Sequence, residues 1–391
     1  MRIAIYFDAR PEQGGLFQYA TGLVDCLFNY VPEHTYGLFF VGNAVKSFPK
    51  PQSGEIIVLD DGAAKARRLL EVGLLAAGKA GLKKPLPIVP APSQISCFAP
   101  ELVIYVKPSL LPALWPWKAV MPVHDLQHRL QPQFKEVSAG GEFQRRELIY
   151  RNSLPRLSAV LVDSQTGKED VLACYPVDKS HIFILPYIAG ELCHVPGAEE
   201  CAAVRNRYQL PEVYLFYPAA FWPHKNHLCL IEALALLRDQ YHLDVTLVLS
   251  GSKKGGYAAV VEWVEQLGLE DRVKFLGYIP DEDMSAVYAL STALVMPTFF
   301  GPTNIPVLEA WAAGTPVITS DIRGIREQVG QAGLLADPQE PEAWAKAIAS
   351  LVNDSALRQR LIQLGFQSHQ GWGRAQFGAE LGRILEQCRT L

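Results

Sequence analysis

The chain has 391 residues, a length that usually exceeds one hydrophobic core, so we expect two domains. Hydrophobic residues make up 49% and charged residues 19%, which is the balance of a globular protein and excludes a disordered one. The formal net charge of -4 provides no basic field of the kind that nucleic-acid binding leaves in a sequence, so we expect no nucleic-acid partner.

The cysteines and apolar runs indicate the compartment. Seven cysteines are scattered without C-x-x-C spacing, which favours reduced thiols over a disulfide framework. The chain enters a strand pattern at Ile3 without the features of a signal peptide, and no apolar run approaches the ~18 to 20 residues of a spanning helix. We therefore expect a cytoplasmic protein, with peripheral contact to the inner face of a membrane left open.

Short apolar runs alternate with helix-length amphipathic segments, which is typical of parallel sheets covered by helices on both faces. The predicted strands are 3–7, 36–41, 56–59, 102–106, 119–123, 159–162 and 182–185, then 213–217, 244–249, 273–276, 293–296 and 316–320. The predicted fold class is α/β, with two doubly wound, Rossmann-like domains facing each other across a cleft. The domains are expected at 1–189 and 197–372, and a final helix, 373–391, is expected to pack back onto the first.

In the first half, polar and glycine residues follow two predicted strands. Gly14 and Gly15 lie between the first strand and the first helix, where glycine permits a close backbone approach. His124 and Asp125 directly follow the buried run 119–123, at the carboxyl edge where open sheets bind ligands. The structural alternative for His124 is an interior histidine that bonds to backbone. The position at a strand end favours a functional one.

Basic residues also gather in the first half. Arg145, Arg146 and Arg151 could attract an anionic acceptor. A second group lies among leucines at 69–75 and resembles a membrane-surface helix, with a solvated helix face as the equal alternative. It comprises Lys65, Arg67, Arg68, Lys79, Lys83 and Lys84.

In the second half, Lys225 and Asn226 occupy a strand-to-helix turn after 213–217, with Asn226 as the expected N-cap. A helix N-terminus with an ammonium group is a suitable phosphate site, because its N–H groups and dipole both favour an anion. The alternative is a solvated surface lysine.

A second turn, Gly301-Pro302-Thr303-Asn304-Ile305-Pro306, precedes a predicted helix that ends at Gly314. Glu309 lies about one turn into it and could accept hydrogen bonds from a ribose diol. Backbone N–H groups of Thr303 and Asn304, at the helix start that Ile305 completes, are expected to face a phosphate or sugar. The alternative for Glu309 is a capping or surface glutamate, which an otherwise apolar helix disfavours.

These segments resemble the donor-binding domain of retaining glycosyltransferase family 4, which has the GT-B fold, in a branch with a G-P-T-N-I-P run. Further motifs are F-L-G-Y-I-P at 275–280, A-G-T-P-V-I at 313–318 and the run 324–338, and the resemblance covers nearly the whole chain. It implies a nucleotide-diphosphate sugar as donor, with Glu309 on the ribose and Lys225 on the diphosphate. It implies no metal ion and no cofactor.

The same resemblance assigns roles in the first half. It places Gly14 and Gly15 near the donor phosphate and the acceptor, and His124, followed by Asp125, on the donor sugar near the reacting carbon. Two positions depart from the family pattern. Gly301 stands where most relatives have a glutamate that touches the donor hexose, and Ala219 stands where many have an arginine. Donor choice is what these departures affect.

The expected activity is transfer of a hexose, with a mannose-like sugar slightly preferred, to a saccharide or lipid-linked acceptor in surface polysaccharide synthesis. Retention favours same-face substitution, in which Lys225 stabilises the leaving diphosphate, a diphosphate oxygen takes the acceptor proton, and Asp125 could assist. The alternatives are a noncatalytic sugar-binding or scaffold paralogue, a nucleotide-sugar epimerase, or a phosphorylase of similar shape.

Overall fold

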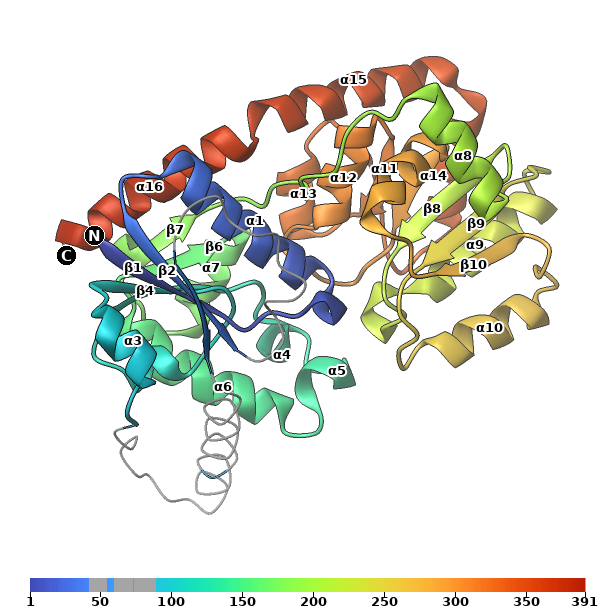
Figure 1. Ribbon diagram of the computed structural model, residues 1–391. Helices are drawn as coiled ribbons and strands as arrows, with labels where there is room; N and C mark the ends of the chain where they lie inside the picture. Colours follow the sequence, from blue (N-terminus) through green and yellow to red (C-terminus); the bar gives the residue numbers. More distant parts are fainter. Residues whose placement is uncertain (42–54, 60–72, 74–88, 391) are drawn as a thin grey trace. The chain divides into compact units, whose positions relative to one another are not determined.

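The computed structural model describes residues 1–41, 55–59, 73 and 89–390. The chain divides into two compact units, one formed by Met1–Ile188 with Arg374–Leu391 and the other by Ala189–Gly373 (Figure 1). The division between Ile188 and Ala189 falls within the proline-containing stretch 186–200, where the sequence lacks helical or strand periodicity.

The first unit contains a seven-stranded parallel sheet in the order β3-β2-β1-β4-β5-β6-β7. Its strands are β1 (Arg2–Phe7), β2 (Thr35–Val41), β3 (Glu55–Leu59), β4 (Leu102–Tyr105), β5 (Lys118–Pro122), β6 (Ala159–Val162) and β7 (Ile182–Ile184). Its described α-helices are α1 (Gly15–Tyr30), α3 (Ser93–Phe98), α4 (Gln127–Leu130), α5 (Lys135–Ser138), α6 (Glu142–Ser153), α7 (Gln165–Cys174) and α16 (Arg374–Thr390).

Helix α16 joins the first unit although it ends the chain. It packs along α1, as Figure 1 shows, and buries Phe377 and Leu381. A Cβ atom at Gly378 would lie 2.3 Å from Tyr30 Cβ, so glycine allows the two helices to approach closely here. An ion pair between Arg374 and Asp25 closes the start of the contact.

The second unit contains a six-stranded parallel sheet in the order β10-β9-β8-β11-β12-β13. Its strands are β8 (Tyr214–Pro218), β9 (Thr246–Ser250), β10 (Val273–Gly277), β11 (Ala293–Met296), β12 (Val317–Ser320) and β13 (Leu334–Ala336). Its helices are α8 (Ala198–Tyr208), the 3₁₀ helix η6 (Pro223–Lys225), α9 (His227–Asp239), α10 (Tyr257–Gln266), α11 (Asp281–Leu290), α12 (Ile305–Ala313), α13 (Arg323–Val329), α14 (Pro341–Asn353) and α15 (Ser355–Gly371).

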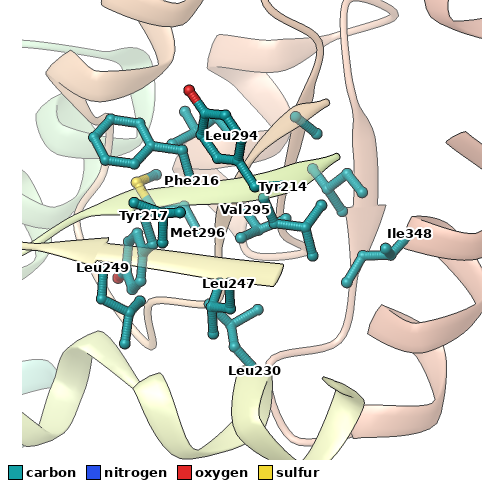
Figure 2. Packing of buried hydrophobic residues seen from close by; sticks show 14 of the residues in the cluster. Tyr214, Phe216, Tyr217, Leu230, Leu247, Leu249, Leu294, Val295, Met296 and Ile348 are labelled. Atoms are coloured by element: carbon teal, nitrogen blue, oxygen red, sulfur yellow. The ribbon is translucent and has the colours of Figure 1, made fainter. Parts of the chain in front are cut away.

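The core of the second unit explains its continuous apolar strand runs. Tyr214, Phe216 and Tyr217 of β8 are all fully buried, because helices cover both faces of the sheet. Figure 2 shows these side chains beside Leu249 of β9 and Leu294 of β11. Strands buried on both faces lack the polar alternation of half-exposed strands, and this is the pattern that predicted a parallel sheet.

The predicted α/β class with two doubly wound parallel sheets is confirmed. In each sheet the strand order reverses once, at β1 and β4 in the first unit and at β8 and β11 in the second. Such switch points are where open α/β sheets bind ligands, outside the carboxyl ends of the strands. They therefore define where a site should be sought in each unit.

Some elements differ from the sequence predictions. Strand β13 was not predicted, since three residues beside glycine carry too little periodicity. None of the helices in the described ranges is both long and apolar enough to cross a membrane. The predicted membrane-surface lysines and arginines at 65–68 and 79–84 lie outside the described residues.

Candidate functional site

Two loops of the second unit leave the strands that flank its switch point. The first follows β8 and carries Lys225, and the second follows β11 and runs through Gly301 to Asn304. Because β8 and β11 are neighbouring parallel strands, both loops emerge at the same edge of the sheet. The fold thus brings together the two segments that the sequence marked for phosphate binding.

Several contacts join the two loops. The His224 carbonyl accepts hydrogen bonds from the Phe299 N–H at 2.9 Å and from Thr298 Oγ1 at 3.3 Å. The His224 ring stacks on Phe300, with centroids 3.9 Å apart and an interplanar angle of 17°. These contacts hold the backbone before Lys225 against the backbone before Gly301.

Lys225 ends η6 and is half-buried, and its carbonyl accepts a hydrogen bond from Tyr217 Oη at 2.9 Å. Helix α9 begins two residues later, at His227. The lysine therefore lies beside a helix start, as predicted. Its role as a phosphate ligand stays a prediction.

Asn226 has the N-cap position of α9, as predicted, but its side chain does not cap the helix. Its backbone is left-handed, with φ of 56°, and its side chain makes no capping bond. Instead the amide Nδ2 donates to the carbonyls of Pro297, at 3.0 Å, and Pro338, at 2.7 Å. Asparagine tolerates this backbone conformation. Its side chain fastens the Lys225 turn to the loop after β11 and to the segment after β13.

The start of the second loop accounts for one departure from the family pattern. Gly301 has φ of +120°, a conformation that strains any residue with a Cβ atom. A Cβ atom there would also lie 3.2 Å from Asn304 Oδ1 and 3.3 Å from Asn304 Nδ2. A glutamate at 301 would thus require a different loop backbone, so this loop conformation depends on glycine.

The Asn304 backbone is clamped by helix α13. Its N–H donates to Gln328 Oε1 and its carbonyl accepts from Gln328 Nε2, both at 2.9 Å. The expectation that the Asn304 N–H faces a phosphate is therefore wrong, because Gln328 occupies that donor. Helix α12 still begins at Ile305 and ends before Gly314, whose φ is 79°, as the sequence predicts.

Glu309 lies in α12 and is only 5% exposed. Its Oε2 accepts a hydrogen bond of 2.8 Å from Tyr288 Oη of α11. Burial, followed by the charge of Glu309, raises the pKa of Tyr288 well above its ordinary value, so the hydroxyl stays protonated and donates. Gly190 lies close by, since a Cβ atom there would be 3.9 Å from Glu309 Oε1. This burial excludes the alternative of a surface glutamate.

In the first unit, His124 follows β5, and its ring contacts Tyr187 and Tyr19. Its Nδ1 is 2.8 Å from Tyr187 Oη, and its ring meets Tyr19 edge-on with centroids 4.8 Å apart. Its Nε2 is buried and has no hydrogen-bond partner among the described residues. Asp163, which follows β6, lies beside the same three side chains.

Burial lowers the pKa of His124 to about 4, so the imidazole is neutral near pH 7. A neutral imidazole has one N–H and one acceptor nitrogen, and the contact with Tyr187 uses one of them. The nitrogen that remains, Nε2, can bond to a hydroxyl of a ligand. This arrangement suits the predicted contact with a sugar and disfavours a histidine satisfied by backbone.

Asp125 is held in place rather than poised for proton transfer. Its Oδ1 accepts hydrogen bonds from Arg146 Nη1 at 2.7 Å and from the Gln127 N–H at 3.0 Å. Burial alone would raise the pKa of Asp125, but Arg146 and Gln127 bring it below its ordinary value. A carboxylate with a lowered pKa is a weak base, and the catalytic role of Asp125 stays a prediction.

The arginines that could attract an anionic acceptor are paired within the protein. Arg145 and Arg146 both bind Glu142, and Arg151 binds Glu147. Their charges are thus largely compensated, which disfavours the predicted basic surface at α6.

Gly14 and Gly15 begin α1, after β1 at the switch point of the first unit. Gly14 has φ of 57° and is open on the side where a Cβ atom would lie. Sequence reasoning missed Lys107, which follows β4 at the other side of this switch point. Its Nζ lies 2.8 Å from the Asp8 carbonyl and 3.3 Å from Asp8 Oδ2. The signal was a charged residue within two positions of the end of each of two buried strands.

Two further residues were missed because their roles depend on tertiary contacts. Tyr187 follows β7 and meets His124, and Gln328 lies four residues after Gly324 on α13. In the described ranges no three His, Cys, Asp or Glu side chains gather into a potential metal site. The expectation of a metal-free reaction stays a prediction.

Comparison with known proteins finds a family match within the second unit. Residues 203–367 match the family model described as glycosyl transferases group 1. O-antigen chain mannosyltransferase B of Escherichia coli is 29% identical over 62% of this chain and 63% of its own length. D-inositol 3-phosphate glycosyltransferase of Corynebacterium urealyticum is 24% identical over 100% of this chain and 96% of its own length. The match to the mannosyltransferase thus spans less than two thirds of that relative.

Solved structures match the fold of nearly the whole chain. HepE of Anabaena, solved with UDP and glucose, has a TM-score of 0.76 at 19% identity and covers 99% of both chains. Sucrose-phosphate synthase of Thermosynechococcus elongatus has a TM-score of 0.76 at 20% identity, covering 100% of this chain and 99% of its own. At such identities the likeness establishes the fold, which is that of GT-B glycosyltransferases.

Proposed function

We propose that this chain, whose residues 203–367 form a glycosyl transferases group 1 domain, transfers a hexose from a nucleotide-diphosphate sugar to a hydroxyl of a saccharide or lipid-linked acceptor. The observation that carries the proposal is the pair of loops at the β8–β11 switch point, which places Lys225 and the start of α12 at one sheet edge. A cation beside a helix start is suited to a diphosphate.

In this proposal, three side chains bind the diphosphate, the ribose and the hexose of the donor. Lys225 stabilises the diphosphate, and the buried carboxylate of Glu309 accepts hydrogen bonds from the ribose diol. The neutral imidazole of His124 contacts the transferred sugar through Nε2. Gly14 and Gly15, at the start of α1, lie near the phosphates or the acceptor in this proposal, and Gly14 is open where a Cβ atom would lie.

The proposed reaction retains the anomeric configuration by substitution on one face. The bond from the anomeric carbon to the diphosphate oxygen breaks as the acceptor oxygen bonds to the same carbon, and the departing diphosphate takes the acceptor proton. Lys225 offsets the charge that develops on the leaving group. The ion pair of Asp125 with Arg146 favours a positioning role for that carboxylate.

The relatives named as O-antigen mannosyltransferases support surface polysaccharide synthesis with a mannose-like donor as the proposed role. The protein is then expected in the cytoplasm, at the inner face of the membrane when the acceptor is lipid-linked. A noncatalytic paralogue is the second candidate, favoured by Gly301 and Ala219 at positions where relatives carry charged residues.

A thermal-shift screen against UDP- and GDP-linked hexoses tests the proposal. A donor at 100 times its Kd should stabilise the folded protein by about 2.7 kcal/mol and raise Tm measurably. The stabilising donor should then release nucleoside diphosphate when incubated with the protein, and it should do so faster when an acceptor saccharide is added. Stabilisation without any release would identify the noncatalytic paralogue, and no stabilisation by any donor would contradict sugar-nucleotide binding.

A further inference from the structure

Asn304 lies at the N-cap of α12, but its side chain does not cap the helix. Such a side chain normally accepts a hydrogen bond from an N–H of the first helical turn. Here it makes no capping bond. Helix capping therefore does not explain this residue.

The Asn304 side chain is nevertheless buried. The residue is 7% exposed, and Nδ2 has no hydrogen-bond partner among the described residues. A buried amide without a partner costs about 1 to 3 kcal/mol, so such groups usually serve a ligand or hold water. The side chain lies beside Gly301, where a Cβ atom would be 3.2 to 3.5 Å from its amide atoms.

Helix α13 fixes the backbone of the residue that carries this amide. Gln328 holds the N–H and the carbonyl of Asn304, each at 2.9 Å. One turn earlier on the same face, Gly324 touches the loop so closely that a Cβ atom would lie 2.0 Å from the Pro302 carbonyl oxygen. The backbone of Asn304 thus cannot turn toward a ligand, whereas its side chain is presented at the loop after β11.

We infer that the side-chain amide of Asn304 hydrogen-bonds the transferred hexose and determines donor choice, in place of an acidic side chain at 301, with Gln328 as its positioning residue. This inference rests on the proposed function. The amide both donates and accepts, whereas a carboxylate only accepts, so the two groups select different hydroxyl arrangements. Because Gly301 has no Cβ atom, it avoids a tight contact of 3.2 to 3.5 Å with this amide.

The test compares binding of the bare nucleotide with binding of the nucleotide sugar. Calorimetry is performed with UDP, GDP, UDP-glucose and GDP-mannose on the wild-type chain and on Asn304→Ala. Asn304→Ala should leave the Kd of the preferred nucleoside diphosphate within about twofold and weaken its sugar by about threefold to tenfold, the size of one neutral hydrogen bond. Asn206→Ala, at an exposed position of α8, is the matched control and should change neither.

Gln328→Met provides the second variant. It removes both bonds to the Asn304 backbone while preserving the length of the side chain, so the amide should lose its fixed position. We expect the selectivity between UDP-glucose and GDP-mannose to decrease in this variant as it does in Asn304→Ala. Thermal unfolding of each variant verifies the fold.

The outcomes separate the inference from the proposed function. The inference is overturned if the wild-type chain binds a nucleotide sugar but Asn304→Ala weakens binding of the bare nucleotide and of the nucleotide sugar by the same factor. It is equally overturned if Asn304→Ala changes the affinity for neither, because Asn304 then does not contact the hexose. If the wild-type chain binds none of the four probes, the proposed function fails and the inference fails with it.

Discussion

The proposed contact between Glu309 and the ribose can be tested by changing both partners, the carboxylate by mutation and the ribose by removal of its hydroxyls. The residue is 5% exposed, and its carboxylate accepts a hydrogen bond from Tyr288 Oη at 2.8 Å. Replacing it with glutamine preserves size and an acceptor oxygen for Tyr288 but removes the charge. A charge-assisted hydrogen bond contributes about 1.5 to 3 kcal/mol and a neutral one about 0.5 to 1.5 kcal/mol. Summed over a ribose diol, Glu309→Gln should weaken nucleoside diphosphate binding by about 1 to 3 kcal/mol, or fivefold to 150-fold in Kd.

The assay is calorimetric titration of the wild-type chain and Glu309→Gln with UDP or GDP and with the 2′,3′-dideoxy analogue. If Glu309 binds the ribose hydroxyls, the analogue should bind both proteins with nearly equal affinity, because it lacks the groups that the carboxylate accepts from. Tyr288→Phe leaves the buried carboxylate with one donor fewer and should lower the free energy of unfolding. Equal weakening of the ribose and dideoxyribose nucleotides by Glu309→Gln would refute the ribose contact.

The other predictions concern both units. Lys225→Ala should lower turnover by roughly 10²- to 10³-fold with an unchanged Tm, and wild-type turnover would eliminate this lysine as the phosphate ligand. His124→Ala should reduce transfer by about 10²-fold or more while nucleoside diphosphate affinity stays within about twofold, because a transition-state contact affects turnover more than binding; normal transfer would make His124 structural. Gly301→Ala should reduce Tm, because φ there is +120°, and an unchanged Tm would contradict the strain argument. Burial lowers the pKa of His124 to about 4 and that of His227 to about 3. Below pH 6.5 the unfolded chain therefore binds more protons at these two histidines than the folded chain does. The free energy of unfolding should consequently fall as the pH is lowered from 6.5 toward 4. Urea unfolding at pH 7 and 5 measures this loss, which should be smaller in His227→Gln.

Much of the fold was predictable because local patterns and tertiary structure agree. Apolar runs such as 214–217 are continuous because β8 is covered on both faces, and this run predicts a parallel strand directly. Pro306 and Gly314 mark the two ends of α12 through backbone conformations that few other residues adopt. By contrast, β13 depends on pairing with β12, and three residues carry no period of their own.

The sequence predicts where the site residues lie better than it predicts which hydrogen bonds they form. Lys225 and Asn304 follow strands that the sequence identifies, so their place at a sheet edge could be inferred. Which N–H groups remain available could not, because that depends on partners distant in sequence. Gln328, 24 residues beyond Asn304, takes the backbone donor that the sequence assigned to a phosphate. Tyr187, 63 residues beyond His124, likewise fixes one nitrogen of the imidazole.

The central claim is that this chain breaks a nucleotide-sugar bond with the help of Lys225. Release of nucleoside diphosphate from UDP- and GDP-linked hexoses, followed with and without added acceptor saccharide, tests it most directly. The wild-type chain and Lys346→Ala, changed at an exposed lysine of α14, should release the diphosphate from one preferred donor at equal rates, and Lys225→Ala should release it at least 100-fold more slowly. Release at the same rate from all three proteins, or from none of them with any donor, would contradict the account.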